Sequence, residues 1–424
     1  MKAAHGGPAV AFACALALWG APRARGEEAA PAGEKTGLPE PTWRGDAPEA
    51  EARTAEEGSW VSAFLKSLRV SGYVETSYVW NVANPKPPAG YPENVNRLFD
   101  VRSNEFSVHA AAITIERPVG EDQYVGFQVT PLIGQDAEFV QAIGLFKNES
   151  GVSESKFDLL DAYVQGYCPV TRTRIKLGKW QTLVGAEVIR GPYNDHFSRS
   201  YLFSYAIPFT HTGLLVIQPV IRRSSGDEDM LFLGGAVSNG WDTVRDMNDA
   251  KDLHATVFFT PCDPFSLAAT YMFSFSEQPG VNDAPRQLVD LVATVRPVPD
   301  LKLVGNFDWG RESEAVGGRD AVWWGFAGSA RYDFSPTGKE TRDWYVAVRG
   351  EYFDDADGAR LPWGGPGGTR VWEVTATLGY TPFEYLLLRA ELRYDKAHLP
   401  IFFDGSDRKD AHQTTLAFEA TFLF

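Results

Sequence analysis

Within the segment Glu384–Lys396, four charged residues alternate with apolar ones, namely Arg389, Glu391, Arg393 and Asp395. Side chains at alternate positions of a strand share one face. Such a charged face cannot meet hydrocarbon, where each charge would cost about 2–4 kcal/mol near the membrane midplane. The chemistry open to it is ion pairing or contact with water, so we predict that it lines a barrel interior. The residues predicted to form this lumen wall are Arg349, Glu351, Glu373, Arg389, Glu391 and Arg393.

A second group of charges lies in the longest gap between predicted strands, Gly185–Thr210. Acids and bases facing each other in a narrow pore would create a transverse field that selects polar solutes by charge and size. A solvated outer loop with ordinary surface charges is the alternative. The candidate constriction residues are Glu187, Arg190, Asp195, His196 and Arg199.

Catalytic and cofactor motifs are weak or missing. The glycine run Gly364–Gly368 lacks the Gly-Lys-Ser/Thr of a nucleotide loop, and Asp354–Gly358 lacks the glutamate at position twelve of a calcium loop. No two histidines after the leader lie four residues apart, so we expect no zinc helix and no metal. An outer-membrane lipase would use a serine and a histidine of the barrel wall, and His196 and Ser198 lie close in sequence, but the sequence has no G-x-S-x-G. We therefore expect no enzyme and no cofactor.

Strands with a period of two must position these charges. Asp343–Phe353 and Val371–Tyr380 each have one apolar face bracketed by aromatic residues, as expected where a strand crosses both membrane interfaces. A soluble β-sandwich with one buried face is the alternative, but it predicts no such aromatic bracketing. The last segment, His412–Phe424, is amphipathic and finishes on an aromatic residue, which is typical of the closing strand of an outer-membrane barrel.

The pattern gives about sixteen strands, an even number as bacterial barrels require. Tight turns such as Cys168–Thr171 and Pro261–Pro264 follow even-numbered strands, whereas longer Gly-, Pro- and Asn-rich stretches mostly follow odd-numbered ones. Short periplasmic turns and long outer loops would produce this alternation. We therefore predict an all-β, antiparallel up-and-down transmembrane barrel over residues 69–424.

The N-terminal region has the features of an export signal followed by a leader. Residues 1–26 combine Lys2, an apolar stretch and a small-x-small site, which predicts a signal peptide. Residues 27–68 are rich in Ala, Pro and Glu and predict a flexible periplasmic leader, with a brief helix possible at its end. The net charge of −15 disfavours nucleic acid as a partner.

Several segments together resemble the OmpL-like family of β-barrel porins, over about Ser71 to Phe424. The resemblance implies a bacterial outer-membrane porin that lets small hydrophilic solutes diffuse passively, and it supplies no particular solute. A plugged structural or adhesive barrel is the main alternative, and a lipase the lesser one. The partners we expect are outer-membrane lipid and lipopolysaccharide, the barrel assembly machinery acting on the strand that ends at Phe424, and, as one open assembly, a homotrimer. The segments that carry the resemblance are Ser71–Asn81, Gly185–Gly213, Ser238–Asp242, Arg349–Asp355 and Leu388–Ala397.

Overall fold

The computed structural model describes residues 60–424 except 154, 224–228, 337–341, 365–366 and 406–408. The signal peptide predicted at residues 1–26 and most of the predicted leader at 27–68 lie outside the described residues. The end of that leader forms the helix α2 (Trp60–Lys66), directly before the first strand. None of the helices in the described ranges is long and apolar enough to cross a membrane.

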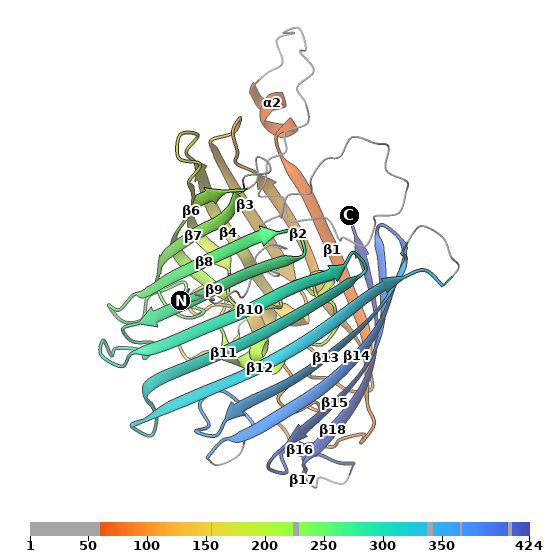
Figure 1. Ribbon diagram of the computed structural model, residues 1–424. Helices are drawn as coiled ribbons and strands as arrows, with labels where there is room; N and C mark the ends of the chain where they lie inside the picture. The colour runs from red at the N-terminus through yellow and green to blue at the C-terminus, as the bar shows by residue number, and fades with distance from the viewer. Residues whose placement is uncertain (1–59, 154, 224–228, 337–341, 365–366, 406–408) are drawn as a thin grey trace, which may run out of the picture.

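Sixteen strands in the described part of the chain close into one antiparallel barrel, as the sequence predicts (Figure 1). Each strand pairs with its neighbours in sequence, and β18 closes the ring against β1. The strands are β1 (Arg69–Asn81), β2 (Glu105–Arg117), β3 (Val125–Ile133), β4 (Phe157–Tyr167), β5 (Arg174–Gln181), β6 (Thr210–Arg222), β7 (Asp229–Ser238), β8 (Asp252–Cys262), β9 (Phe265–Ser274), β10 (Arg286–Val298), β11 (Leu301–Val316), β12 (Arg319–Phe334), β13 (Trp344–Asp355), β14 (Thr369–Phe383), β15 (Leu386–Ala397) and β18 (His412–Leu423).

The closing seam extends to the last residue. Phe424 donates its backbone N–H to the carbonyl of Gly72 at 3.0 Å and accepts the N–H of Gly72 at 2.8 Å. Closure pairs both edges of the sheet. An unpaired edge is not tolerated in hydrocarbon, because no water is present there to bond its backbone N–H and C=O groups. The apolar period of the final segment therefore belongs to the strand that completes the barrel.

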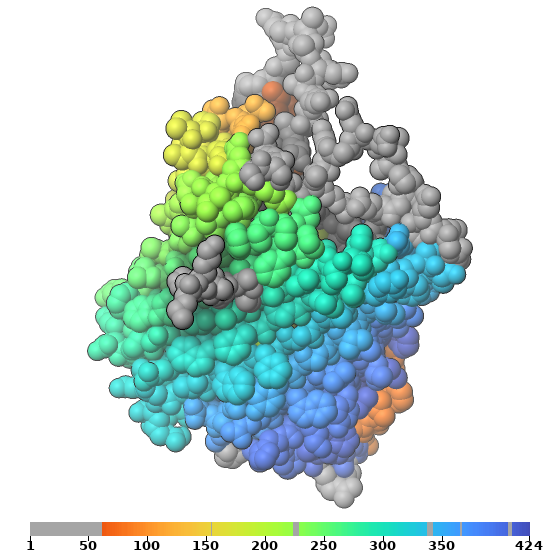
Figure 2. All heavy atoms as spheres, in the orientation of Figure 1, coloured from red at the N-terminus to blue at the C-terminus, as the bar shows by residue number. Residues whose placement is uncertain are grey.

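Aromatic residues ring the outer face at both ends of the strands. Trp344 on β13 stacks on Tyr380 of β14 with 4.1 Å between ring centroids, and Trp372, near the other end of β14, packs on Tyr394 of β15 at 5.5 Å. These pairs confirm the two aromatic belts that the sequence predicts. Figure 2 shows the outer wall over β10–β15 as a continuous surface without an opening between strands.

Turn lengths follow the predicted alternation with one exception. Tight turns join β4 to β5 and β8 to β9, at the end of the barrel where α2 and the C-terminus lie (Figure 1). The exception is β11–β12, where a hairpin turns through Gly317 and Gly318 with φ of 58° and 76°. Two consecutive positive φ values are those of a two-residue hairpin turn whose backbone twist matches the twist of the flanking strands. Glycine adopts such φ values at the least energetic cost.

The outer end carries small elements that the strand pattern does not reveal. The helix α3 (Gln135–Val140) follows β3, and the short pair β16 (Phe402–Phe403) and β17 (Lys409–Asp410) lies between β15 and β18. Phe402 is fully buried and belongs to the same apolar cluster as Phe99 and Leu361 from two other outer loops. These loops fold inward and bury part of the outer mouth.

Candidate functional site

Residues 182–209, here called the inner loop, connect β5 to β6 and run through the barrel interior. The loop contains the short helical turns η1 (Gly191–Tyr193) and η2 (Leu202–Ala206), and all five residues of η2 are buried. The connection is longer than the predicted gap Gly185–Thr210, because β5 already stops at Gln181. The residues after Gln181 leave the sheet to enter the lumen.

Arginines of the predicted lumen wall hold the backbone carbonyls of the inner loop. Arg389 on β15 donates to the carbonyls of Asn194 at 2.7 Å, His196 at 2.9 Å and Gly191 at 3.1 Å. A guanidinium has five donors in a rigid fork and can bind several carbonyls at once. Arg393 extends the pattern by donating to the carbonyl of Arg199 at 2.6 Å, and Arg349 on β13 does so to the carbonyl of Ser198 at 2.9 Å.

Carboxylates of the same wall hold the backbone N–H groups of the loop. Glu391 accepts from Phe197 N at 2.8 Å and from Ser198 N at 3.1 Å. Glu351 accepts from Tyr201 N at 2.7 Å and from Leu202 N at 2.6 Å. An irregular segment inside a barrel has backbone groups that must find partners, and the wall supplies them.

The sixth wall residue, Glu373, bonds to other wall residues. It accepts from Arg349 Nε at 2.7 Å, and its second oxygen lies 3.7 Å from Arg393 Nε. All six predicted residues point inward, but each is no more than 5% exposed. Five of them anchor the inner loop, and Glu373 pairs with two of the anchoring arginines. These partners are needed because a buried charge is tolerated only when it is paired and hydrogen-bonded.

Two aromatic side chains of the wall also donate hydrogen bonds to the loop. The hydroxyl of Tyr345 donates to the carbonyl of Asp195 at 3.0 Å, and the indole N–H of Trp323 donates to the carbonyl of Ala206 at 3.1 Å. Tyr345 lies flat against Gly379 on β14, where a Cβ would come within 1.9 Å of the ring. Glycine is thus required there for close approach of the ring to the strand.

The five predicted constriction residues divide into two groups in space. Glu187, Asp195 and His196 line a common cavity of about 120 Å³ between the inner loop and the wall β10–β13. Arg190 instead pairs with Asp161 on β4, with 2.9 Å between Nη2 and Oδ2. Arg199 bonds to backbone carbonyls within the loop and is 3% exposed. The two arginines therefore hold the loop and do not line this cavity.

Three basic residues on β10, β11 and β13 face the same cavity, namely Arg296, Lys302 and Arg349. Lys302 pairs with Asp195 at 2.7 Å. Arg296 and Lys302 are not among the residues predicted from the sequence. Arg296 lies beside the turn that joins β10 to β11, and only Lys302, together with Asn306 and Asp308, shows the alternation of polar residues that marks an inward face. That alternation within Leu301–Arg311 was the available signal.

The charges of Asp195 and His196 are set by their surroundings. Burial alone would raise the pKa of Asp195, but Lys302 and Arg331 hold the pKa of this carboxyl well below its ordinary value. Burial, reinforced by Arg349, holds the pKa of His196 well below 6.5. Asp195 is thus ionised and His196 neutral at pH 7, with His196 Nδ1 in a 2.8 Å hydrogen bond to the hydroxyl of Thr377.

We expect the attachment of the inner loop to weaken as the pH falls below about 6.5. A released His196 would titrate near its ordinary pKa of about 6.5, whereas the buried ring resists protonation, so acid favours the released loop. Hydrogen exchange of loop amides at pH 7.5 and 5.5 measures the effect, and His196→Gln should remove much of the difference. His412→Gln, at an exposed position, is the control. An unchanged pH response in His196→Gln would show that other groups cause it.

Comparison with known proteins gives a family and a fold. A family model described as putative beta-barrel porin-2, OmpL-like, matches residues 67–424. No curated protein matches the sequence.

Three solved structures show the same fold at low identity. The outer membrane channel DcaP of Acinetobacter baumannii has a TM-score of 0.52 and 12% identity, covering 84% of this chain and 97% of its own. An anion-selective porin from Comamonas acidovorans has the same TM-score, identity and share of this chain, with 99% of its own covered. A trimer form of OmpT from Vibrio cholerae has a TM-score of 0.51 and 11% identity, covering 84% and 99%. The closed sixteen-stranded barrel and the family match over nearly all its length show that the chain belongs to the OmpL-like β-barrel porins of the bacterial outer membrane.

Proposed function

We propose that small hydrophilic solutes cross this porin along the side of the inner loop that faces β10–β13, and that anions are preferred. The observation that carries the proposal is the cavity of about 120 Å³ at that position. Its lining has three bases, Arg296, Lys302 and Arg349, against two acids, Glu187 and Asp195. An excess of positive charge in a narrow, partly desolvated passage raises the local concentration of anions.

The anchoring residues have an indirect role in this proposal. Arg190 and Arg199 keep the inner loop in place, and five of the six wall charges, all except Glu373, bind its backbone on the side of β13–β15. The loop is thereby held against one side of the barrel, and the cavity lies toward the other. No catalytic step is assigned: His196 bonds to Thr377, while the hydroxyl of Ser198 faces Arg393 Nη1 at 3.3 Å, so the two do not form a nucleophile–base pair.

Contacts with other molecules form part of the proposal. The aromatic belts would sit at the two interfaces of an outer-membrane bilayer containing lipopolysaccharide, and the assembly machinery would act on the strand ending at Phe424. A homotrimer is supported by the trimer form of OmpT, whose barrel has the same fold.

Single-channel conductance of the refolded mature chain in a planar bilayer, under a salt gradient, tests the route. We expect discrete conductance steps and a reversal potential that reports anion preference. The double variant Arg296→Gln/Lys302→Gln should shift the reversal potential toward cations, since it removes two of the three bases. Arg311→Gln is the control, because Arg311 is about half exposed on an outer hairpin and pairs with Asp320.

Two results would argue against the proposal. A correctly folded barrel that gave no conductance would favour the plugged structural barrel. A conducting double variant with an unchanged reversal potential would place the selective passage elsewhere in the lumen.

A further inference from the structure

Two aspartates face each other across neighbouring strands, next to the first residues of the inner loop. Asp290 on β10 and Asp308 on β11 are directly opposite in the strand register, and both residues are 0% exposed. Opposite side chains of an antiparallel pair have Cβ atoms only about 4.5–5.5 Å apart. The two carboxyl groups, here called the aspartate pair, lie within hydrogen-bonding reach of each other. They are neither wall anchors nor part of the lining of the cavity at β10–β13.

One asparagine bridges the aspartate pair. Asn306 lies two residues before Asp308, on the same face of β11. Its Nδ2 is 3.2 Å from Asp290 Oδ1 and 3.3 Å from Asp308 Oδ2. The other oxygen of each carboxyl, Oδ2 of Asp290 and Oδ1 of Asp308, has no hydrogen-bond donor among the described residues. Such buried acceptors have lost their bonds to water, so each calls for a donor.

The charges that act most strongly on the aspartate pair are acidic. They are the two aspartates themselves and Glu351 on β13. On β12 the residue opposite Asp308 is Gly325, which has no side chain. If both aspartates were ionised, their repulsion inside the protein would have no close counter-ion to offset it.

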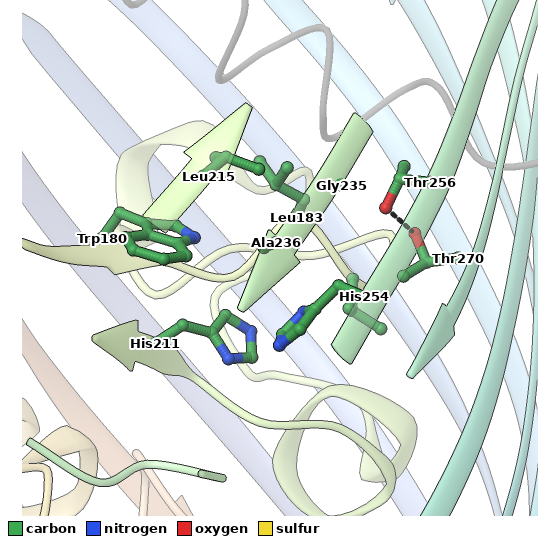
Figure 3. Close-up of a pocket in the computed structure, with 10 residues that line it drawn as sticks. Trp180, Leu183, His211, Leu215, Gly235, Ala236, His254, Thr256 and Thr270 are labelled. Atoms are coloured by element: carbon green, nitrogen blue, oxygen red, sulfur yellow. Dashed lines mark hydrogen bonds between the residues drawn. The ribbon is translucent and has the colours of Figure 1, made fainter. Parts of the chain in front are cut away.

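The β8–β9 side of the aspartate pair supplies hydroxyl and imidazole groups. Asp290 is opposite Thr270 on β9, and the hydroxyl of Thr270 bonds to that of Thr256 on β8 at 3.1 Å (Figure 3). His211 and His254 line the small cavity beside these threonines, and neither acts on Asp290. This side therefore provides no positive charge to the aspartate pair.

The aspartate pair and its asparagine hold the first residues of the inner loop. The backbone N–H of Gly185 donates a hydrogen bond to Asp290. The N–H of Ala186 donates to Asn306 Oδ1 at 3.3 Å. Ala186, Glu187 and Asn306 also line the cavity at β10–β13. A change in the charge of the aspartate pair would thus reach the loop where it borders that cavity.

We propose that Asp290 and Asp308 share one proton at neutral pH, and that release of this proton to solvent at higher pH loosens the start of the inner loop. One O–H, donated from one carboxyl to the other, supplies a missing donor and leaves the aspartate pair with a single negative charge. The amide of Asn306 and the N–H of Gly185 bond that charge. Two carboxyls at such short range cannot both ionise easily, so they titrate as a unit.

Infrared spectroscopy of the refolded mature chain in detergent tests the shared proton, because a protonated carboxyl has a C=O stretching band that a carboxylate lacks. At pH 7 we expect Asp290→Asn, Asp308→Asn and the double variant each to lose the band of one carboxyl. One proton serves both residues, and in a single variant the asparagine amide replaces the O–H as donor. Asp320→Asn is the control, since Asp320 is about half exposed on the β11–β12 hairpin, and it should lose nothing.

Urea unfolding gives a second readout. The unfolded chain releases both protons above about pH 4, whereas the folded pair keeps one, so a rise in pH favours unfolding. Between about pH 5 and 7 the unfolding constant of the unaltered chain should rise about tenfold per pH unit relative to that of the double variant. This comparison cancels the effects of His196 and other groups common to both chains.

Hydrogen exchange at residues 185–187, corrected for its intrinsic rise with pH, tests the effect on the loop. Exchange should quicken in the unaltered chain at the pH where the shared-proton band disappears, and the double variant should show no such step.

Three results would overturn the proposal. An unchanged band in the double variant would mean that both carboxyls are ionised, and a loss twice that of a single variant would mean that each carries its own proton. Exchange at residues 185–187 without a step in the unaltered chain would show that the aspartate pair does not control the loop, and this result holds even if a variant fails to fold. None of these measurements requires conductance, so they are independent of the proposed solute route.

Discussion

Replacing Arg389 with methionine is expected to destabilise the barrel by about 3–5 kcal/mol and to release the inner loop. Arg389 forms a fully buried pair with Glu419, in which Nη2 lies 2.8 Å from Oε1, and it also holds three loop carbonyls. Methionine fills part of the volume but donates nothing. Glu419 would then be a buried charge without its arginine, and the carbonyls would lose their donor.

Urea unfolding of the refolded chain in detergent measures the first effect, and hydrogen exchange of residues 190–197 measures the second. Arg370→Met is the matched control on the neighbouring strand. Its guanidinium lies 2.7 Å from Asp354 but is half exposed, so solvent screens the pair and the loss should be much smaller than for Arg389→Met. Equal losses in Arg389→Met and Arg370→Met would mean that the buried network does not determine how the loop is held.

Replacing Gly379 with alanine should cost about 1–3 kcal/mol, although alanine is ordinarily at least as favourable as glycine in a strand. The new Cβ would come 1.9 Å from Tyr345 Cε1, and an aromatic ring cannot yield as a flexible side chain can. Tyr345 would have to move, breaking its 3.0 Å hydrogen bond to Asp195 and its stacking under Arg331, whose guanidinium carbon is 3.8 Å from the ring centroid.

The same urea titration tests this prediction, together with a double variant. Gly379→Ala/Tyr345→Ala should lose less than the sum of the two single losses, since the clash disappears with the ring. Gly350→Ala on β13 is the control, because a Cβ there would meet only the carbonyl of Glu373 at 4.0 Å. A fully additive double variant would show that the ring and the glycine do not act together.

The sequence by itself determined the barrel. Alternation places Arg389, Glu391 and Arg393 on one face of their strand and the apolar residues between them on the other. This pattern is local, so it can be recognised in a strand without knowing which distant residues the strand contacts. The cost of charge in hydrocarbon decides which face is inside. Strand order follows as well, because antiparallel neighbours joined by short connections pair in sequence.

Only the tertiary structure decided what the inward charges do. Arg389 and Asn194 are 195 residues apart, and Glu391 and Phe197 are 194 apart, yet they are bonded. A period of two says that a side chain points inward but carries no information on what occupies the interior. The path of the inner loop depends on many such bonds formed together across the lumen. For that reason the wall residues that were predicted to face water bind the loop instead. Lys302 and Arg296 are recognised as site residues only in the structure, because they line the cavity that the loop leaves beside β10–β13.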